Sequence, residues 1–312
     1  DEPLVPYFEE EAQDLDKVLN IFIRVNSAGT PLSYSDLLLS IATAKWSARE
    51  DDVDARQAVR GLVEDLNKVG QGFDISKDLV LKAGLMLADI QSVAFRVTNF
   101  NSKNMATLEA QWTQIERSLR AATELLASYG LSRQNLAAHS VLIPVAYYLH
   151  KRNLDEHYVA SPAFRADREL VRGWVYRSLV KIGIWGSGLD SLLLALRTTI
   201  DSQGHDRFPV KELEEVMARR GKSLGFTEEE LRDLLDSEYG DPRTFILLAL
   251  LFPHMDMKNL FHVDHVFPKS KFTRAQLRDA GIPEGQREAF IEMFNRLANL
   301  QLLEGLENID KR

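Results

Sequence analysis

The sequence predicts a mainly α-helical protein: a multi-helix central body with one small unit of two short strands near the C-terminal end. Three observations predict this class. Apolar residues recur at helical spacing through most of the 312 residues, and alternation with period two is almost absent before residue 255. One segment near residue 262 then alternates β-branched or aromatic residues with polar ones. We expect a helical N-terminal tail over residues 1–50, a helical body over 51–255 and a separate C-terminal unit over 256–312.

Composition limits the class of protein. With 46 acidic and 38 basic residues the formal net charge is -8, which argues against a surface coated in positive charge. The absence of cysteine excludes disulfides, a cysteine nucleophile and thiolate metal sites, so any metal must bind oxygen or imidazole. The longest strongly apolar run, 245–252, is far shorter than the ~20 residues of a membrane-spanning helix. The sequence therefore predicts no membrane partner and, with no secretory signal in view, a cytoplasmic location.

Helices are expected wherever apolar residues share one face. A first helix ends near residue 25 at the turn-like residues 26–29, and Ser33 is the expected N-cap of the next. The body should then begin with a solvated helix near residues 49–60, and Gly130 should end a long helix over 108–129. Further helices are expected at 79–90, 141–149, 170–184, 189–200, 210–219, 227–237, 244–251 and 284–298.

The two strand candidates lie near the C-terminal end. The segment 261–268 alternates in character and ends at a proline, and a second short strand is expected at 299–304. The residues between them are too many for a tight connection, so we expect this insert to pack as a small helical lobe. Its first part carries the basic residues Lys269, Lys271, Arg274 and Arg278.

Four polar residues around these strands supply what metal-assisted phosphodiester hydrolysis requires. Asp264 could bind Mg²⁺ or Mn²⁺ through oxygen, with Asn308 as the second protein ligand. His265 would be the general base, because an imidazole titrates near neutral pH and can take a proton from an attacking water. Asn299 would hold the imidazole by a hydrogen bond.

Structural interpretations compete with this catalytic one. An aspartate beside a histidine is often a structural pair, and a regular strand points adjacent side chains to opposite faces. Asp264 and His265 can therefore meet one phosphate only near a twisted strand end. His262 could be a third ligand or a strand residue that faces the helical body, and the basic residues could form a solvated face or a phosphate-tracking groove.

Taken together, these residues resemble an HNH (ββα-metal) nuclease motif. The segment 262–268 reads His-Val-Asp-His-Val-Phe-Pro, and the nine-residue step from Asn299 to Asn308 is similar to that of the HNH domain in CRISPR effector nucleases. The closest family resemblance is to the GmrSD-type modification-dependent restriction endonucleases, whose C-terminal domain has a His-x-x-Pro signature, matched here by His265 and Pro268. The resemblance implies a bacterial anti-phage restriction enzyme that cuts DNA. It also implies that Asp264 and Asn308 occupy the positions of the metal ligands.

A second resemblance to the same family lies in residues 22–33, which are similar to the segment that follows its ParB-like nucleotide-binding core. Arg24, Asn26 and Gly29 belong to this stretch, and they could contact a nucleotide or partner domain, or simply end a helix. The Asp-Gly-Gln-Gln-Arg signature of that core is absent. The resemblance thus implies a nucleotide only through a preceding ParB-like domain.

The partners that follow are DNA, in modified form in this family, the ParB-like domain and, left open by the sequence, further copies of the chain. Lys269, Lys271, Arg274 and Lys311 are the residues expected to contact DNA. Because only four residues follow Asn308, we expect the final helix of the motif to be cut short, and the sequence leaves open whether this chain is active as it stands. The alternative function is a noncatalytic helical interaction module with a degenerate motif.

Overall fold

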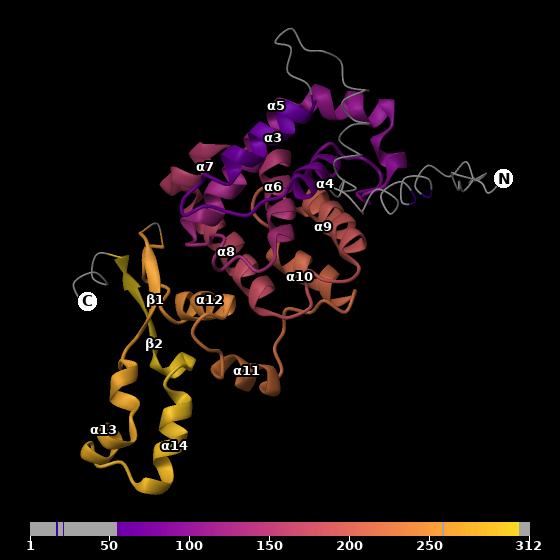
Figure 1. The fold of residues 1–312 in the computed structure, drawn as a ribbon. Helices are drawn as coiled ribbons and strands as arrows, with labels where there is room; N and C mark the ends of the chain where they lie inside the picture. The colour runs from indigo at the N-terminus through magenta and orange to yellow at the C-terminus, as the bar shows by residue number, and fades with distance from the viewer. Residues whose placement is uncertain (1–16, 18–20, 22–54, 258, 306–312) are drawn as a thin grey trace, which may run out of the picture. The chain divides into compact units, whose positions relative to one another are not determined.

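The structure, a computed structural model, describes residues 17, 21, 55–257 and 259–305 of the chain. Within these residues the protein is mainly α-helical, as the sequence predicts, with a single two-stranded antiparallel sheet (Figure 1). The α-helices are α3 (Ala55–Leu66), α4 (Lys77–Leu87), α5 (Ser102–Ser128), α6 (Leu142–Lys151), α7 (Glu156–Ala160), α8 (Arg165–Val180), α9 (Leu189–Gln203), α10 (Val210–Ala218), α11 (Glu228–Leu235), α12 (Pro242–Leu251), α13 (Arg274–Asp279) and α14 (Glu284–Met293). The strands are β1 (Phe261–His265) and β2 (Leu300–Glu304), and the 3-10 helices are η1 (Val97–Phe100), η2 (His139–Val141), η3 (Pro162–Phe164), η4 (Lys269–Phe272) and η5 (Leu297–Asn299).

The chain divides into two compact units. The first comprises residues 1–65 and 75–116, and the second comprises 66–74 and 117–312. Both strands, all of the helices from α6 onward and most of the residues with predicted chemistry belong to the second unit. The domain boundaries expected near residues 50 and 255 stay predictions.

The first unit is built on the close packing of α4 against the beginning of α5. Ser76 caps α4 by accepting a hydrogen bond from the backbone N–H of Leu79 at 3.2 Å. A Cβ on Gly84 would lie 2.9 Å from the end of the Leu108 side chain, so a larger residue would require this side chain to shift. Trp112 of α5 is buried in the same unit. α4 therefore begins at a serine cap and has an apolar, closely packed face.

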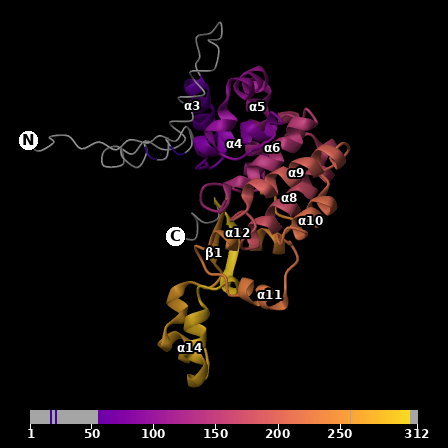
Figure 2. The same ribbon diagram turned by 90° about the vertical axis from the view of Figure 1, so that its right-hand side faces the viewer.

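The second unit is built around α6, in which every residue from Leu142 to His150 is buried. A helix that is apolar on all sides belongs in a core, and α9 packs beside it. Figure 2 shows α8, α9 and α10 side by side. Gly130 follows α5 with φ +74°, and a Cβ there would lie 2.7 Å from the Phe245 ring of α12. The glycine predicted to end this helix thus also admits α12 to the core.

The C-terminal part of the second unit contains the strand pair and its helical insert. β1 pairs with β2 in antiparallel register, and α12 contacts both strands. Between the strands, α13 and α14 lie against each other, which matches the expected helical lobe (Figure 1). Thr273 caps α13 by accepting from the backbone N–H of Gln276 at 3.3 Å.

Several predicted boundaries differ from the structure, two of them near the candidate site. β1 ends at His265 rather than at residue 268, because the carbonyl of Asn299 accepts from the Val266 N–H and the Asn299 side chain binds the backbone of Phe267. The helix expected over 284–298 ends at Met293, since Arg296 forms an isolated bridge with Glu238. Among the described residues, no helix is long and apolar enough to cross a membrane.

Candidate functional site

The candidate site lies where β1 ends. His265 is the last residue of the strand and pairs with Leu300, while its neighbour Asp264 pairs with Gln301. The Gly305 N–H, directly after β2, donates to the carbonyl of Leu260, directly before β1, at 2.8 Å. The Asp264–His265 pair stands at the other end of the strand pair, where two adjacent side chains have the freedom to converge.

The imidazole of His265 is held by three residues. Its ring stacks between Tyr239, with ring centroids 5.0 Å apart and planes at 28°, and Phe294, at 5.7 Å and 19°. Its Nε2 lies 3.1 Å from Oδ1 of Asn295. Because stacked rings restrict rotation about the side-chain bonds and the amide fixes the ring edge, the partly buried imidazole has a defined orientation.

These holding residues come from two segments that pair with each other. The backbone N–H of Tyr239 donates to the carbonyl of Asn295 at 2.9 Å, and that of Leu297 donates to Ser237 at 2.7 Å. The turn after α11 is therefore fastened to the end of α14. The pairing places Tyr239 on one face of the His265 ring and the α14 end on the other.

The Asn295 contact determines which ring nitrogen is basic. An amide oxygen only accepts hydrogen bonds, so Oδ1 of Asn295 requires the proton of a neutral imidazole on Nε2. Nδ1 of His265 then keeps the lone pair, and no described residue forms a hydrogen bond with it. The arrangement presents Nδ1 as a general base.

Asp264 supplies the carboxylate of the site. Its side chain is partly buried, and its oxygen donors are of the type that Mg²⁺ and Mn²⁺ prefer. The described residues contain no group of three or more histidines, aspartates or glutamates arranged to hold a metal ion. The expected second ligand, Asn308, is a carboxamide that lies outside the described residues. The metal site stays a prediction.

The role expected for Asn299 needs correction. Its buried side chain does not bond the imidazole, which is held by Asn295 instead. Oδ1 of Asn299 accepts from the Phe267 N–H at 2.9 Å, while Nδ2 donates to the carbonyls of Phe267 at 3.0 Å and Phe294 at 2.7 Å. The physical reason is that the Asn299 side chain lies between two backbone segments, the loop at Phe267 and the end of α14 at Phe294. It fixes the loop after His265 and the residue whose ring stacks on His265, so it supports the imidazole indirectly.

The basic residues of the insert divide into two pairs. Arg274 forms an ion pair with Glu288 at 2.6 Å, and Arg278 forms one with Asp279 at 3.1 Å. Both arginines are exposed, but each charge is offset by its neighbour. Of these two, Arg274 was expected to contact DNA, and the ion pair makes it less available for a phosphate.

Lys269 and Lys271 have no acidic partner among the described residues. The Lys269 ammonium lies 5.4 Å from the centroid of the Phe294 ring, the same ring that stacks on His265. Lys271 is exposed in the same 3-10 turn, η4. The structure therefore places one expected DNA-binding lysine beside the candidate base.

Several predicted residues are not located. Arg24, Asn26 and Gly29 of the N-terminal motif, Lys311 of the basic set and Asn308 all lie outside the described residues.

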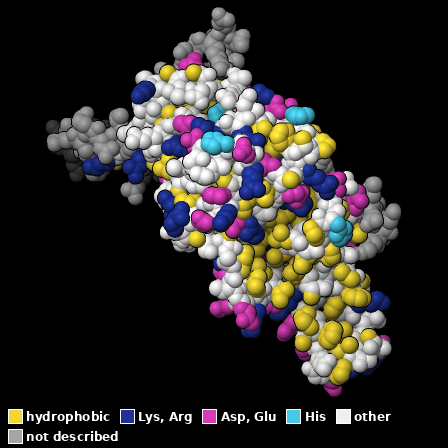
Figure 3. Space-filling view, turned by 180° about the vertical axis from the view of Figure 1, so that it is seen from behind, with side chains coloured by type: hydrophobic (Ala, Val, Ile, Leu, Met, Phe, Trp, Pro, Cys, Tyr) yellow, Lys and Arg dark blue, Asp and Glu magenta, His cyan; other side chains and the backbone are white. Residues whose placement is uncertain are grey.

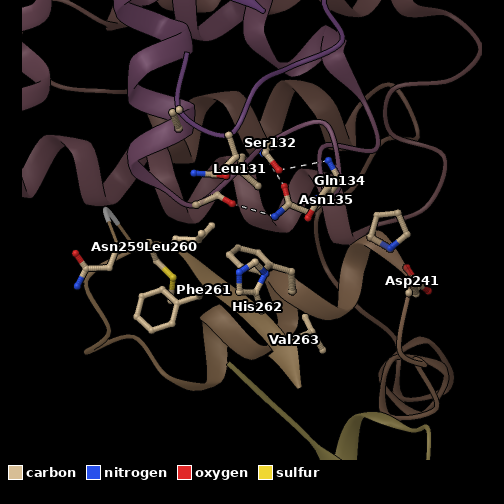
Figure 4. A pocket seen from close by; sticks show the side chains of 18 of the residues that line it. Leu131, Ser132, Gln134, Asn135, Asp241, Asn259, Leu260, Phe261, His262 and Val263 are labelled. Carbon is tan, nitrogen blue, oxygen red and sulfur yellow. Dashed lines mark hydrogen bonds between the residues drawn. The ribbon is translucent and has the colours of Figure 1, made fainter. Parts of the chain in front are cut away.

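A cavity of about 290 Å³ lies on the other part of β1, between the strand and the loop after α5 (Figure 4). His262 projects toward this loop, as expected for a strand residue that faces the helical body. Asn135 orders the loop by accepting from the Ser132 N–H at 2.7 Å and donating to the Gly130 carbonyl at 2.9 Å. Neither Asp264 nor His265 lines the cavity, but Tyr239, which stacks on His265, does, so the cavity borders the candidate site.

Sequence reasoning missed Tyr239, Phe294 and Asn295. Tyr239 is 26 residues from His265 in the chain, and its neighbours Gly240, Asp241 and Pro242 indicate only a turn. Asn295 lies four residues before Asn299 within a predicted helix, which gave no reason to assign it a separate role.

No protein-family model matches the chain, and no curated protein matches it. The function therefore rests on the chemistry of the site.

Proposed function

We propose that this chain is a DNA endonuclease subunit of a bacterial anti-phage restriction system, acting through a C-terminal HNH-like site. The observation that carries the proposal is the held imidazole of His265, which stands at a strand end beside Asp264 and whose Nδ1 has no hydrogen-bond partner in the described part of the chain.

The reaction class follows from these side chains. Nδ1 of His265 accepts a proton from the water that attacks phosphorus, while Asn295 keeps the other ring nitrogen protonated. Asp264 would hold Mg²⁺ or Mn²⁺ together with Asn308, and the ion would supply charge stabilisation at the phosphate oxygens. Both ligands are oxygen donors, which suits a hard divalent cation.

The strand pair supplies the ββ part of an HNH-like unit. β1 and β2 are antiparallel, and Asn299, directly before β2, fixes the loop after β1. This strand pair supports the resemblance to the GmrSD-type enzymes, and in that family context the partners are DNA, in modified form, and a ParB-like domain. Lys269 beside the His265 site supplies positive charge for a phosphate.

Plasmid cleavage tests the proposal. Supercoiled plasmid, unmodified and carrying modified cytosine, is incubated with the protein in Mg²⁺ or in EDTA. We expect Mg²⁺-dependent nicking, and a decrease of about 10²–10⁴-fold in its rate for His265→Ala, the range for loss of a general base. The exposed residue His205, which lies outside the site, gives the control variant His205→Ala. Equal nicking by His265→Ala at unchanged melting temperature would refute the assignment.

Asp264 is tested by metal binding. Calorimetric titration of Mg²⁺ into Asp264→Ala should show weaker affinity than titration into the unaltered protein, because one of two protein ligands is lost. Unchanged affinity would count against Asp264 as a ligand.

A noncatalytic interaction module is the alternative, and one surface feature favours it. Seen from behind, hydrophobic side chains gather over the C-terminal lobe (Figure 3). Such a surface is typical of a protein contact. An absence of nicking in every plasmid condition, together with an intact fold, would favour this function.

A further inference from the structure

Phe267 is a large aromatic residue whose side chain is exposed to solvent. Its side chain is 61% exposed, and that of the preceding Val266 is 44% exposed. Single exposed apolar residues are common on protein surfaces. Here the Asn299 carboxamide binds both the N–H and the carbonyl of Phe267, at 2.9 and 3.0 Å. The exposed ring is therefore attached to a backbone that is fixed by hydrogen bonds.

A buried amide fixes the backbone of Phe267. The Asn299 side chain is only 7% exposed, and its three hydrogen bonds join this loop to the end of α14. The arrangement preorganises Phe267 for a contact.

The chain around Phe267 is basic. The chain from His265 to Arg278 contains four basic residues and no acidic one. With Arg274 and Arg278 offset by ion pairs, Lys269 and Lys271 remain to face a polyanion. An aromatic ring flanked by lysines is the combination with which proteins bind unstacked bases, since the ring covers a base and the lysines track the phosphates.

The spacing to the candidate base also fits nucleic acid. Phe267 follows His265 by two residues, which corresponds to roughly 7 Å of extended chain. Bases in a DNA strand are spaced by about 3.4 Å along the helix axis. A base contacted by Phe267 would therefore lie within about two nucleotides of the phosphate that His265 addresses.

We propose that Phe267 stacks on, or wedges beside, a base next to the cleaved phosphate, so that the preferred substrate is duplex DNA with a locally weakened base step. The inference rests on the proposed nuclease function and adds a substrate preference to it. Unstacking a base step costs free energy, and it costs least at a mismatch or bulge. Cleavage should thus favour duplexes that contain such a defect over fully paired ones.

A fluorescent duplex tests this directly. Two 30-base-pair DNAs are prepared, one fully paired and one with 2-aminopurine in a single mismatch, and binding is followed by anisotropy with Ca²⁺ in place of Mg²⁺ to prevent cleavage. For the intact chain we expect tighter binding to the mismatched duplex and a change in 2-aminopurine fluorescence as the base stacks on Phe267. Cleavage of both duplexes is then measured with Mg²⁺.

Three variants separate the outcomes. Phe267→Ala should lose about tenfold in affinity for the mismatched duplex, and with it the fluorescence change, as expected when one stacked base is lost. Phe267→Trp keeps a flat ring and should retain both. Ile182 is 78% exposed at the end of α8, so Ile182→Ala controls for removal of an exposed apolar side chain and should bind like the intact chain.

The failures of the two proposals are distinguishable. If Phe267→Ala binds and cuts both duplexes like the intact chain, the inference is overturned and the nuclease stands. If the intact chain cuts DNA but treats the two duplexes alike, the substrate preference is overturned. If the intact chain neither binds nor cuts either duplex, the proposed function fails and this inference fails with it.

Discussion

Asp167 in the helical body and His265 at the end of β1 are both polar centres of the second unit, but they are held differently. Oδ2 of Asp167 accepts hydrogen bonds from the hydroxyls of Tyr148 at 2.6 Å and Tyr158 at 2.9 Å, and Oδ1 accepts from the Phe208 N–H at 2.7 Å. The Asp167 side chain is only 10% exposed. His265, by contrast, makes a single hydrogen bond among the described residues.

The difference shows how one fold separates stability from chemistry. Every oxygen of Asp167 is occupied, and burial together with this carboxylate raises the pKa of the Tyr148 hydroxyl, so the hydroxyl stays protonated and keeps donating. The His265 ring is fixed in position, yet one nitrogen stays free to take a proton. A network in which every polar atom has a hydrogen-bond partner stabilises the fold. A side chain that is fixed in position but keeps an unbonded nitrogen can take part in a reaction.

The largest expected effect is on the stabilising centre. Asp167→Ala removes the acceptor of two buried tyrosine hydroxyls and leaves Arg152, 3.3 Å from Oδ2, without its carboxylate. The free energy of unfolding, measured by urea denaturation, should fall by about 3 kcal/mol or more. Asp167→Asn keeps one acceptor oxygen and should lose less. A loss below about 1 kcal/mol for Asp167→Ala would show that the network is not a stabilising centre.

A smaller loss of stability is expected at Asn299, a buried residue that supports the His265 site. Asn299→Ala removes three hydrogen bonds of a buried carboxamide, and the free energy of unfolding should fall by about 2 kcal/mol. Amide exchange at Phe267 should accelerate more than exchange at Leu302, which lies in the middle of β2. Gln301→Ala, on the same strand, is the control and should change neither quantity much. Equal acceleration at both amides would mean that Asn299 supports the sheet generally.

The next effect concerns how His265 is held. Asn295→Ala leaves Nε2 without its acceptor, so we expect the nicking rate at saturating DNA to fall about tenfold, the equivalent of one hydrogen bond of ~1.4 kcal/mol, while KM is unchanged. Asn295→Asp keeps an acceptor oxygen and should recover most of the rate. A rise in KM at constant kcat would instead place Asn295 in DNA binding.

The smallest effect is a pH dependence in the helical body. Burial lowers the pKa of His139, partly countered by the negative charge of Asp74, and its Nε2 is buried without a partner. The unfolded chain therefore binds a proton more readily than the folded one. This stability is complete above the ordinary pKa of 6.5 and declines as the pH falls below it.

Urea unfolding at pH 7.5 and 5.5 measures this contribution. His139→Gln cannot titrate, so its loss of stability between the two pH values should be smaller than that of the intact chain, whereas the exposed His205→Gln should behave like the intact chain. An identical pH dependence in His139→Gln and the intact chain would assign the decline to other groups.

Local patterns in the sequence predicted most of the described elements. The capping box of Thr227 and Glu230 begins α11 as expected, and Gly130 follows α5 in a left-handed conformation. These features succeed because helix ends and turns depend on residues within one or two turns of each other. The same local logic placed Asp264 and His265 on a short strand.

By itself, the sequence determined the mainly helical class, the strand pair and the residue types at its end, because these depend on periodicity and on neighbours in the chain. Only the tertiary structure decided that Asn295, rather than Asn299, holds the imidazole, and that Tyr239 and Phe294 enclose its ring. The physical reason is that these contacts join segments that come together only when α11, the end of α14 and β1 pack against one another. No local sequence pattern predicts these contacts, since each of the three residues would fit its own segment equally well if the contacts were absent.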